Sequence, residues 1–129
     1  NIGRLKTNLK GFESRYELHE VAVGLENGHA DFGFEATGRY GGLKSNLPET
    51  IQVQVRKVEE IISSILEKED HIDILKIDVE GLETAIVKSL SPDNLKNINR
   101  VYAETIYSEC LPGFDKEQYG EVVRFRKIL

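Results

Sequence analysis

The chain lacks the features that mark several common classes of protein. It has no methionine and one cysteine, Cys110, which alone can form neither an internal disulfide bond nor a metal cluster. No apolar run approaches the roughly 18 residues that a membrane-spanning helix needs. The formal charge of -5 comes from interspersed acidic and basic residues, which does not favour a nucleic-acid-binding surface. We therefore expect a cytoplasmic protein that binds neither nucleic acid nor membrane.

The beginning of the chain also lacks two expected signals. It opens on Asn1 rather than on methionine, and its first residues are polar with scattered apolar positions, unlike a signal peptide. We therefore expect residues 1–129 to form a single domain that is part of a longer protein. With 40% apolar residues, a chain of this length can bury a core without disulfide bonds or metals.

In the first part of the chain, the spacing of apolar residues predicts a short helix and a hairpin. Apolar residues recur at helical spacing over 2–9. Strands are expected over 16–24 and 30–36, because these segments contain alternating or β-branched apolar residues. The dipeptide Asn27-Gly28 is typical of a tight turn, so it should join the two strands as an antiparallel hairpin.

From residue 37 onwards, strand and helix periods alternate. The expected elements, in order, are a glycine-containing loop over 37–50, a strand over 51–55, an amphipathic helix over 58–66, a central strand over 72–79, a helix over 82–90 that Pro92 ends, a strand over 101–107, and a tail over 117–129 that fits either helix or strand. Strands that alternate with helices predict an α/β fold with a mostly parallel, doubly wound sheet and an inserted antiparallel hairpin.

Acidic residues cluster after the apolar strand over 72–79. Ligands of open α/β sheets bind outside the carboxyl ends of the strands, and Asp78 and Glu80 lie at this end. Asp78 is flanked by apolar residues, where a carboxylate is costly to bury without a partner, so a backbone N–H, Lys76 or a cationic ligand should neutralise it. Glu83 falls in the first turn of the next helix, which the helix dipole alone favours.

Glu104 is a second acidic candidate, in the strand over 101–107. In a doubly wound sheet this strand would neighbour the one that carries Asp78 and Glu80, so the three carboxylates should converge. Clustered carboxylates suit the binding of a cationic group, the binding of a divalent metal or the acceptance of a proton, and these three tasks remain open. The histidines are scattered without metal-ligand spacing, so no histidine-based metal site is expected.

The segment KIDVEGLE, residues 76–83, preceded by the apolar IDIL, resembles the most characteristic motif of the FkbM methyltransferases. The flanking segments agree in order. Residues 8–24 resemble the end of a helix followed by the third strand of the family's domain, and the GRYGG loop resembles its inserted hairpin. IQVQVRKVEEII resembles the strand and helix before the motif, and VYAETIY resembles the strand that ends in an acid. The resemblance covers residues 5–107.

This resemblance implies a Rossmann-like class I methyltransferase fold and S-adenosylmethionine-dependent methyl transfer, commonly to a hydroxyl oxygen of a small molecule or sugar. It implies that Asp78 lies beside the sulfonium of the cofactor or beside the acceptor. Glu80 and Glu104 would orient or deprotonate the acceptor, since an oxygen nucleophile loses its proton as it attacks. Val21 and Ala22 would lie near the adenine.

Two departures from the family pattern bear on these roles. The glycine-rich loop and the ribose-binding acid that normally hold such a cofactor are not among the 129 residues. We therefore expect a domain without its first strands, and weak cofactor binding by this chain alone. The family also often places a histidine shortly after the acid that corresponds to Glu104, and this chain does not. Lys76 and Glu83 are further candidate contacts to the acceptor.

Two other functions remain open at this point. One is a noncatalytic α/β interaction domain, and the other is a magnesium-dependent enzyme that uses Asp78, Glu80 and Glu104. An incomplete sheet would also expose a strand edge, so a homodimer that forms through that edge is a further expectation.

Overall fold

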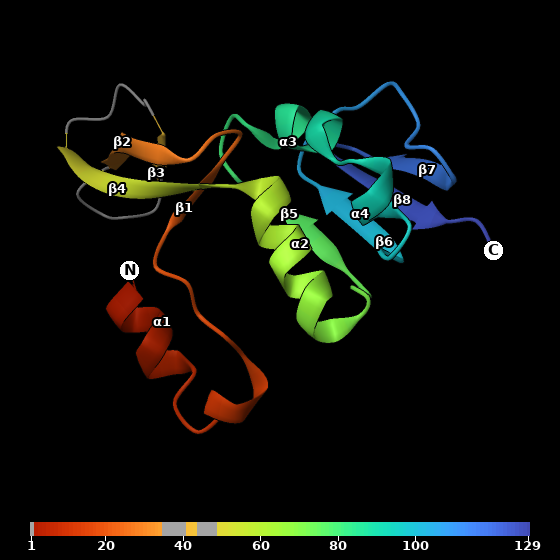
Figure 1. Ribbon diagram of the computed structural model, residues 1–129. Helices are drawn as coiled ribbons and strands as arrows, with labels where there is room; N and C mark the ends of the chain where they lie inside the picture. Colours follow the sequence, from red (N-terminus) through yellow and green to blue (C-terminus); the bar gives the residue numbers. More distant parts are fainter. Residues whose placement is uncertain (1, 35–40, 44–48) are drawn as a thin grey trace.

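The computed structural model describes residues 2–34, 41–43 and 49–129, which form a mixed α/β structure (Figure 1). Its elements are α1 (Ile2–Asn8), the 3-10 turn η1 (Glu13–Arg15), β1 (Ala22–Gly24), β2 (Gly28–Phe34), β3 (Gly41–Leu43), β4 (Glu49–Lys57), α2 (Val58–Glu69), β5 (Leu75–Ile77), α3 (Glu83–Ser89), α4 (Pro92–Leu95), β6 (Arg100–Ala103), β7 (Phe114–Tyr119) and β8 (Val122–Lys127). The α/β class predicted from the sequence is confirmed.

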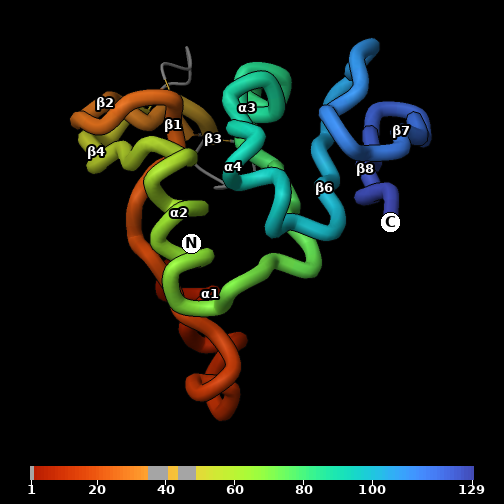
Figure 2. The backbone as a smooth tube through the Cα atoms, turned by 45° about the vertical axis from the view of Figure 1, so that its right-hand side comes forward, coloured from red at the N-terminus to blue at the C-terminus, as the bar shows by residue number. Residues whose placement is uncertain are grey.

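The strands form two four-stranded sheets instead of one mostly parallel sheet. The first sheet has the order β1-β4-β2-β3 and the second the order β5-β6-β8-β7. Only β1 with β4 and β5 with β6 pair in parallel, and the other neighbouring strands are antiparallel. The helices α3 and α4 connect β5 to β6 as the crossover that a parallel pair requires. In Figure 2 the helices α2, α3 and α4 lie between the two sheets.

The predicted hairpin between residues 16–24 and 30–36 is wrong. β1 pairs with β4, and β2 lies on the other side of β4, where it pairs antiparallel with β4 and with β3. The reason lies in Asn27, whose side chain binds the beginning of α2 and does not close a two-residue turn. Its Oδ1 accepts from the N–H of Lys57 at 2.8 Å, and its Nδ2 donates to the carboxylate of Glu60 at 2.8 Å.

Several predicted strands are shorter in the structure. β1 and β6 occupy three and four residues, and β5 is limited to Leu75–Ile77, with Ile72 forming an isolated bridge to Ile98. The predicted loop over 37–50 contains β3 and the first residues of β4, and its remaining positions, 35–40 and 44–48, lie outside the described residues. These include most of the predicted GRYGG loop.

The two central helices agree with their predicted patterns. α2 buries Val58 and Ile62, and α3 ends before Pro92 as expected. Pro92 then begins α4, because proline lacks the N–H that the first helical turn leaves unpaired, and the Ser91 hydroxyl accepts from the N–H of Asn94 at 3.2 Å.

The ambiguous tail forms a β-hairpin. β7 and β8 pair antiparallel from Phe114 with Lys127 to Tyr119 with Val122. Gly120 supplies the turn with a φ of 57°, a conformation that favours glycine. The tail therefore forms half of the second sheet.

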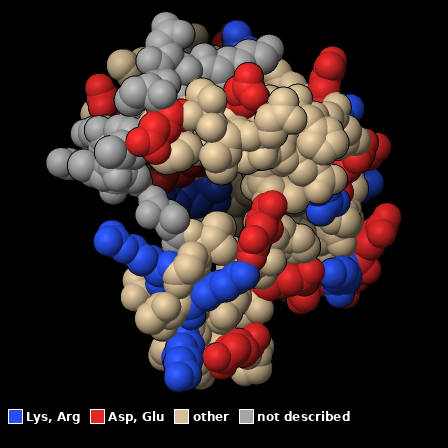
Figure 3. All heavy atoms as spheres, turned by 90° about the vertical axis from the view of Figure 1, so that its left-hand side faces the viewer, with Lys and Arg blue, Asp and Glu red and all other residues tan. Residues whose placement is uncertain are grey.

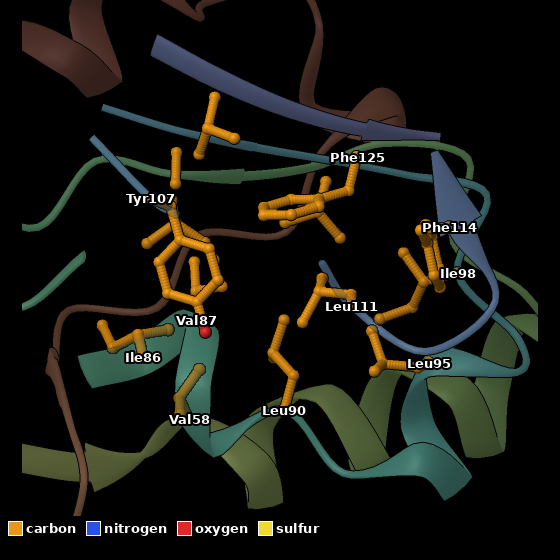
Figure 4. Close-up of a cluster of buried hydrophobic side chains, with 14 of the residues drawn as sticks. Val58, Ile86, Val87, Leu90, Leu95, Ile98, Tyr107, Leu111, Phe114 and Phe125 are labelled. Atoms are coloured by element: carbon orange, nitrogen blue, oxygen red, sulfur yellow. The ribbon is translucent and has the colours of Figure 1, made fainter. Parts of the chain in front are cut away.

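The hydrophobic core lies between α2, α3, α4 and the second sheet (Figure 4). Its largest fully buried side chain is Phe125, which meets the ring of Tyr107 edge to face, with centroids 5.7 Å apart and an angle of 81° between the planes. By contrast, α1 buries no residue and lies apart from both sheets in Figure 1. None of the described helices is long and apolar enough to cross a membrane.

Candidate functional site

A pocket of about 250 Å³ lies between the first sheet and the turn that follows β5. It is lined by Val21, Ala22, Val23, Phe32, Gly41, Gly42, Leu43, Asp78, Val79 and Glu80. Most of this lining is apolar, and two acidic residues, Asp78 and Glu80, contribute to it. Figure 3 shows the molecule from the side of the first sheet, where the surface is hollowed, with basic atoms inside the hollow and acidic side chains at its edge.

The segment KIDVEG brings the carboxylates to this pocket through a tight turn. β5 ends at the buried Ile77, and the chain then turns into α3 at Gly81, whose φ of +80° favours glycine. The N–H of Leu82 donates to the carbonyl of Val79 at 2.9 Å and closes the turn. Glycine at position 81 therefore allows the polar residues at the end of the strand to face the pocket while the chain reverses.

Asp78 is paired, but it is not buried as its apolar neighbours suggested. The Nζ of Lys76 donates to its Oδ2 at 2.5 Å, and the side chains of Lys76 and Asp78 are 69% and 44% exposed. The expected burial of Asp78 is therefore wrong, and Lys76, one of its three expected partners, is confirmed. The hydrogen bond from Lys76 lowers the pKa of Asp78, against the smaller opposing effect of burial. The same hydrogen bond and the charge of Asp78 raise the pKa of Lys76.

Glu104 lies near this pair because β6 runs beside β5. Its N–H donates to the carbonyl of Ile77 at 3.3 Å, so its backbone continues the ladder between the two strands. The Glu104 side chain makes the smallest contribution to the lowered pKa of Asp78, and its charge contributes to the raised pKa of Lys76. Lys76, Asp78 and Glu104 therefore form one cluster at the ends of two parallel strands.

The other predicted site residues divide between the pocket and its surroundings. Val21, Ala22 and Glu80 all line the pocket, although β1 contributes residues from its beginning and not from its carboxyl end. Glu83 is the first residue of α3 and is not among the pocket residues. The favourable position of an acid at a helix N-terminus accounts for Glu83.

Sequence patterns did not identify Phe32, Gly41 and Gly42 as pocket residues. The two glycines lie in the segment expected to form a loop, but they belong to β3, beside Phe32 of β2. A Cβ added at Gly42 would lie 3.5 Å from the Cβ of Glu80, so β3 closely approaches the turn after β5. Paired glycines within a strand signal close approach of the backbone to another group, and this signal could have indicated a wall of the site.

The described part of the chain contains no group of three or more histidine, cysteine, aspartate or glutamate side chains placed to hold a metal ion. The pocket therefore offers carboxylates beside an apolar wall, which suits a ligand that carries both a positive charge and an apolar or aromatic part.

Comparison with known protein families agrees with the resemblance found in the sequence. Residues 3–127 match the family model of the methyltransferase FkbM domain. Because the match covers almost the whole chain, the protein belongs to the FkbM methyltransferase family. No curated protein and no solved structure matches the chain.

Proposed function

We propose that the chain contributes to S-adenosylmethionine-dependent transfer of a methyl group to a hydroxyl oxygen of a small molecule or sugar. Membership of a methyltransferase family supports the reaction class. The observation that supports the proposal is the pocket, whose lining residues include Asp78 and Glu80 together with apolar residues at the beginning of β1.

The pocket residues fit part of this cofactor. The apolar side chains of Val21 and Ala22 suit the flat face of an adenine ring, and the ionised carboxylate of Asp78 suits a sulfonium cation. The volume of about 250 Å³ lies just below the range of roughly 300–1,000 Å³ typical of small-molecule sites. The 129 residues also contain no G-x-G-x-x-G segment of the kind that binds dinucleotides. We therefore expect weak binding of S-adenosylmethionine by this chain alone, and tight binding in a calorimetric titration would contradict that expectation.

The carboxylates of the pocket are assigned different tasks. When bound, S-adenosylmethionine supplies an electrophilic methyl group. A lowered pKa makes Asp78 a weak proton acceptor, so we assign it to the binding of positive charge. Glu80 lines the same pocket, and we assign it to the hydroxyl group, whose proton it accepts as the oxygen attacks. Glu104 orients Asp78 or the acceptor, and Lys76 keeps Asp78 ionised and in place.

The test uses the protein as it is encoded, with S-adenosylmethionine labelled in its methyl group and a panel of sugars and small hydroxylated compounds. Asp78→Asn should lower kcat/KM by about 100-fold, the order of effect seen when one group that stabilises charge is removed. Asp115→Asn is the matched control, because Asp115 lies in β7, pairs with Arg126 at 3.2 Å and is not a pocket residue. Undiminished transfer by Asp78→Asn would remove Asp78 from the site.

We also propose that the chain forms a homodimer through the edge of β5. In the described residues β5 pairs only with β6, at one end of the second sheet. Ile74, just before β5, is 56% exposed. An unprotected edge invites pairing with another strand. Sedimentation should therefore show a dimer that Ile74→Lys converts to a monomer, and a dimer that persists in this variant would exclude this edge.

A further inference from the structure

The hairpin of β7 and β8 has no part in the site described so far, yet one of its side chains binds the segment that follows β6. The side-chain amide of Gln118 joins three backbone groups. Its Nε2 donates to the carbonyl of Thr105 at 3.1 Å and to that of Gly120 at 2.9 Å, and its Oε1 accepts from the N–H of Tyr107 at 3.3 Å. Gln118 therefore connects the turn of its own hairpin to the segment beyond β6.

Two further side chains hold the same segment. The Nζ of Lys116, also in β7, donates to the carbonyl of Tyr107 at 2.8 Å and to that of Ser108 at 2.9 Å. On the opposite side, the hydroxyl groups of Thr84 in α3 and Thr105 lie 2.7 Å apart. Residues 105–108 are outside any helix or strand, so their polar backbone groups need such partners.

This held segment begins directly after Glu104. The N–H of Glu104 is bound to the carbonyl of Ile77, which fixes its backbone on the side of β5. On its other side, residues 105–108 are fixed by β7, by α3 and by the buried ring of Tyr107, which packs against Phe125. The backbone at Glu104 is therefore held from both sides, next to Asp78 at the ends of the paired strands β5 and β6, and one of these sides depends on β7.

We propose that Gln118 is a positioning residue, which holds the segment after β6 so that the carboxylate of Glu104 meets Asp78. This inference rests on the proposed function for its catalytic meaning. A side-chain amide is the group that fits, because it donates to two carbonyl oxygens and accepts from one N–H at the same time. Glutamate has the same shape but places a second oxygen against both carbonyls, and leucine leaves all three backbone groups without this partner.

The experiment measures how Glu104 affects the titration of Asp78 in the 129-residue chain. NMR of labelled carboxyl carbons gives the midpoint of Asp78 in the wild type and in Glu104→Ala, and the difference between the two midpoints is the coupling of the two groups. The coupling should be present in the wild type and lost in Gln118→Leu. Asp115→Asn, a substitution in the same strand, should retain it.

The shift reports contact between two side chains, so a role of Gln118 in stability alone would not change it in a folded variant. If Gln118→Leu does not fold, the isosteric Gln118→Glu takes its place, with the same expected loss. Retention of the full coupling in a folded Gln118 variant overturns the inference. The measurement uses neither methyl donor nor acceptor. Its result therefore does not depend on whether the proposed methyl transfer takes place, and a failure of the role of Gln118 can be told apart from a failure of the proposed reaction.

Discussion

Asn27 joins the segment between β1 and β2 to the beginning of α2, and its replacement by alanine tests that connection directly. The residue lies in the connection between β1 and β2, two strands of the first sheet. Its side chain binds Lys57 and Glu60 at the beginning of α2. Lys57 is the N-cap residue of α2, and its own side chain makes no capping hydrogen bond. Asn27 therefore caps a helix from a distant part of the sequence, and α2 leads to β5, which Asp78 follows.

The expected loss of stability follows from the two hydrogen bonds. A hydrogen bond contributes about 0.5–1.5 kcal/mol to stability, and one to a charged group about 1.5–3 kcal/mol. Asn27 is exposed, so the lower part of these ranges applies, and Asn27→Ala should lower the free energy of unfolding by about 1–2 kcal/mol, as for the loss of a helix cap. With a slope of about 2 kcal/mol per molar urea, the midpoint of unfolding should fall by about 0.5–1 M.

Urea unfolding of two further variants separates the contributions. Asn27→Asp keeps the acceptor for the N–H of Lys57 but places a carboxylate against Glu60, so an intermediate loss is expected. Asn99→Ala is the matched control, because the exposed Asn99 makes one side-chain hydrogen bond, to Asp73 at 3.2 Å. If Asn27→Ala destabilises the fold no more than Asn99→Ala does, then Asn27 does not cap α2 from the segment between β1 and β2.

Other substitutions give separate tests of the fold and the site. Gly41→Ala should lower the free energy of unfolding by about 1–3 kcal/mol in thermal unfolding, as overpacking does. The added Cβ would lie 2.7 Å from a ring carbon of Phe32. Gly42→Ala, with its nearest contact at 3.5 Å, should change stability little. Phe125→Ala should cost about 3–5 kcal/mol, measured by urea unfolding. The lowered pKa of Asp78 stabilises the fold above the unfolded-state pKa of about 3.9, and this contribution is lost as pH falls through the folded-state value. The small stability advantage of the wild type over Lys76→Met should therefore shrink in acid urea titrations.

The parts of the fold that the sequence predicted well carry a local signal. The apolar period of α2 and the strand-to-helix turn at Gly81 depend on neighbouring residues, so they could be read directly. The pairing of β1 with β4 could not, because it joins Ala22 to Val55, and because Asn27 binds a helix rather than closing a hairpin. Such contacts depend on the tertiary arrangement, which overrides turn propensity.

In the candidate site too, some residues carry a local sequence signal and others depend on tertiary contacts. Asp78 and Glu104 follow strands whose parallel pairing was expected, so their proximity could be anticipated. The expected burial of the Asp78 carboxylate is wrong, since its side chain is 44% exposed and pairs with Lys76. Phe32 could not be assigned to the site in advance, because it reaches it only through the placement of the first sheet against the turn after β5.

The central claim is that the pocket between the first sheet and the turn after β5 binds the methyl donor. It is tested most directly by backbone NMR of the chain titrated with S-adenosylmethionine to millimolar concentration. The largest changes in chemical shift should occur at 21–23, Gly42 and 78–80, and Asp78→Asn should weaken them while Asp115→Asn should not. Changes confined to other residues, or equal changes in the wild type and Asp78→Asn, would contradict it.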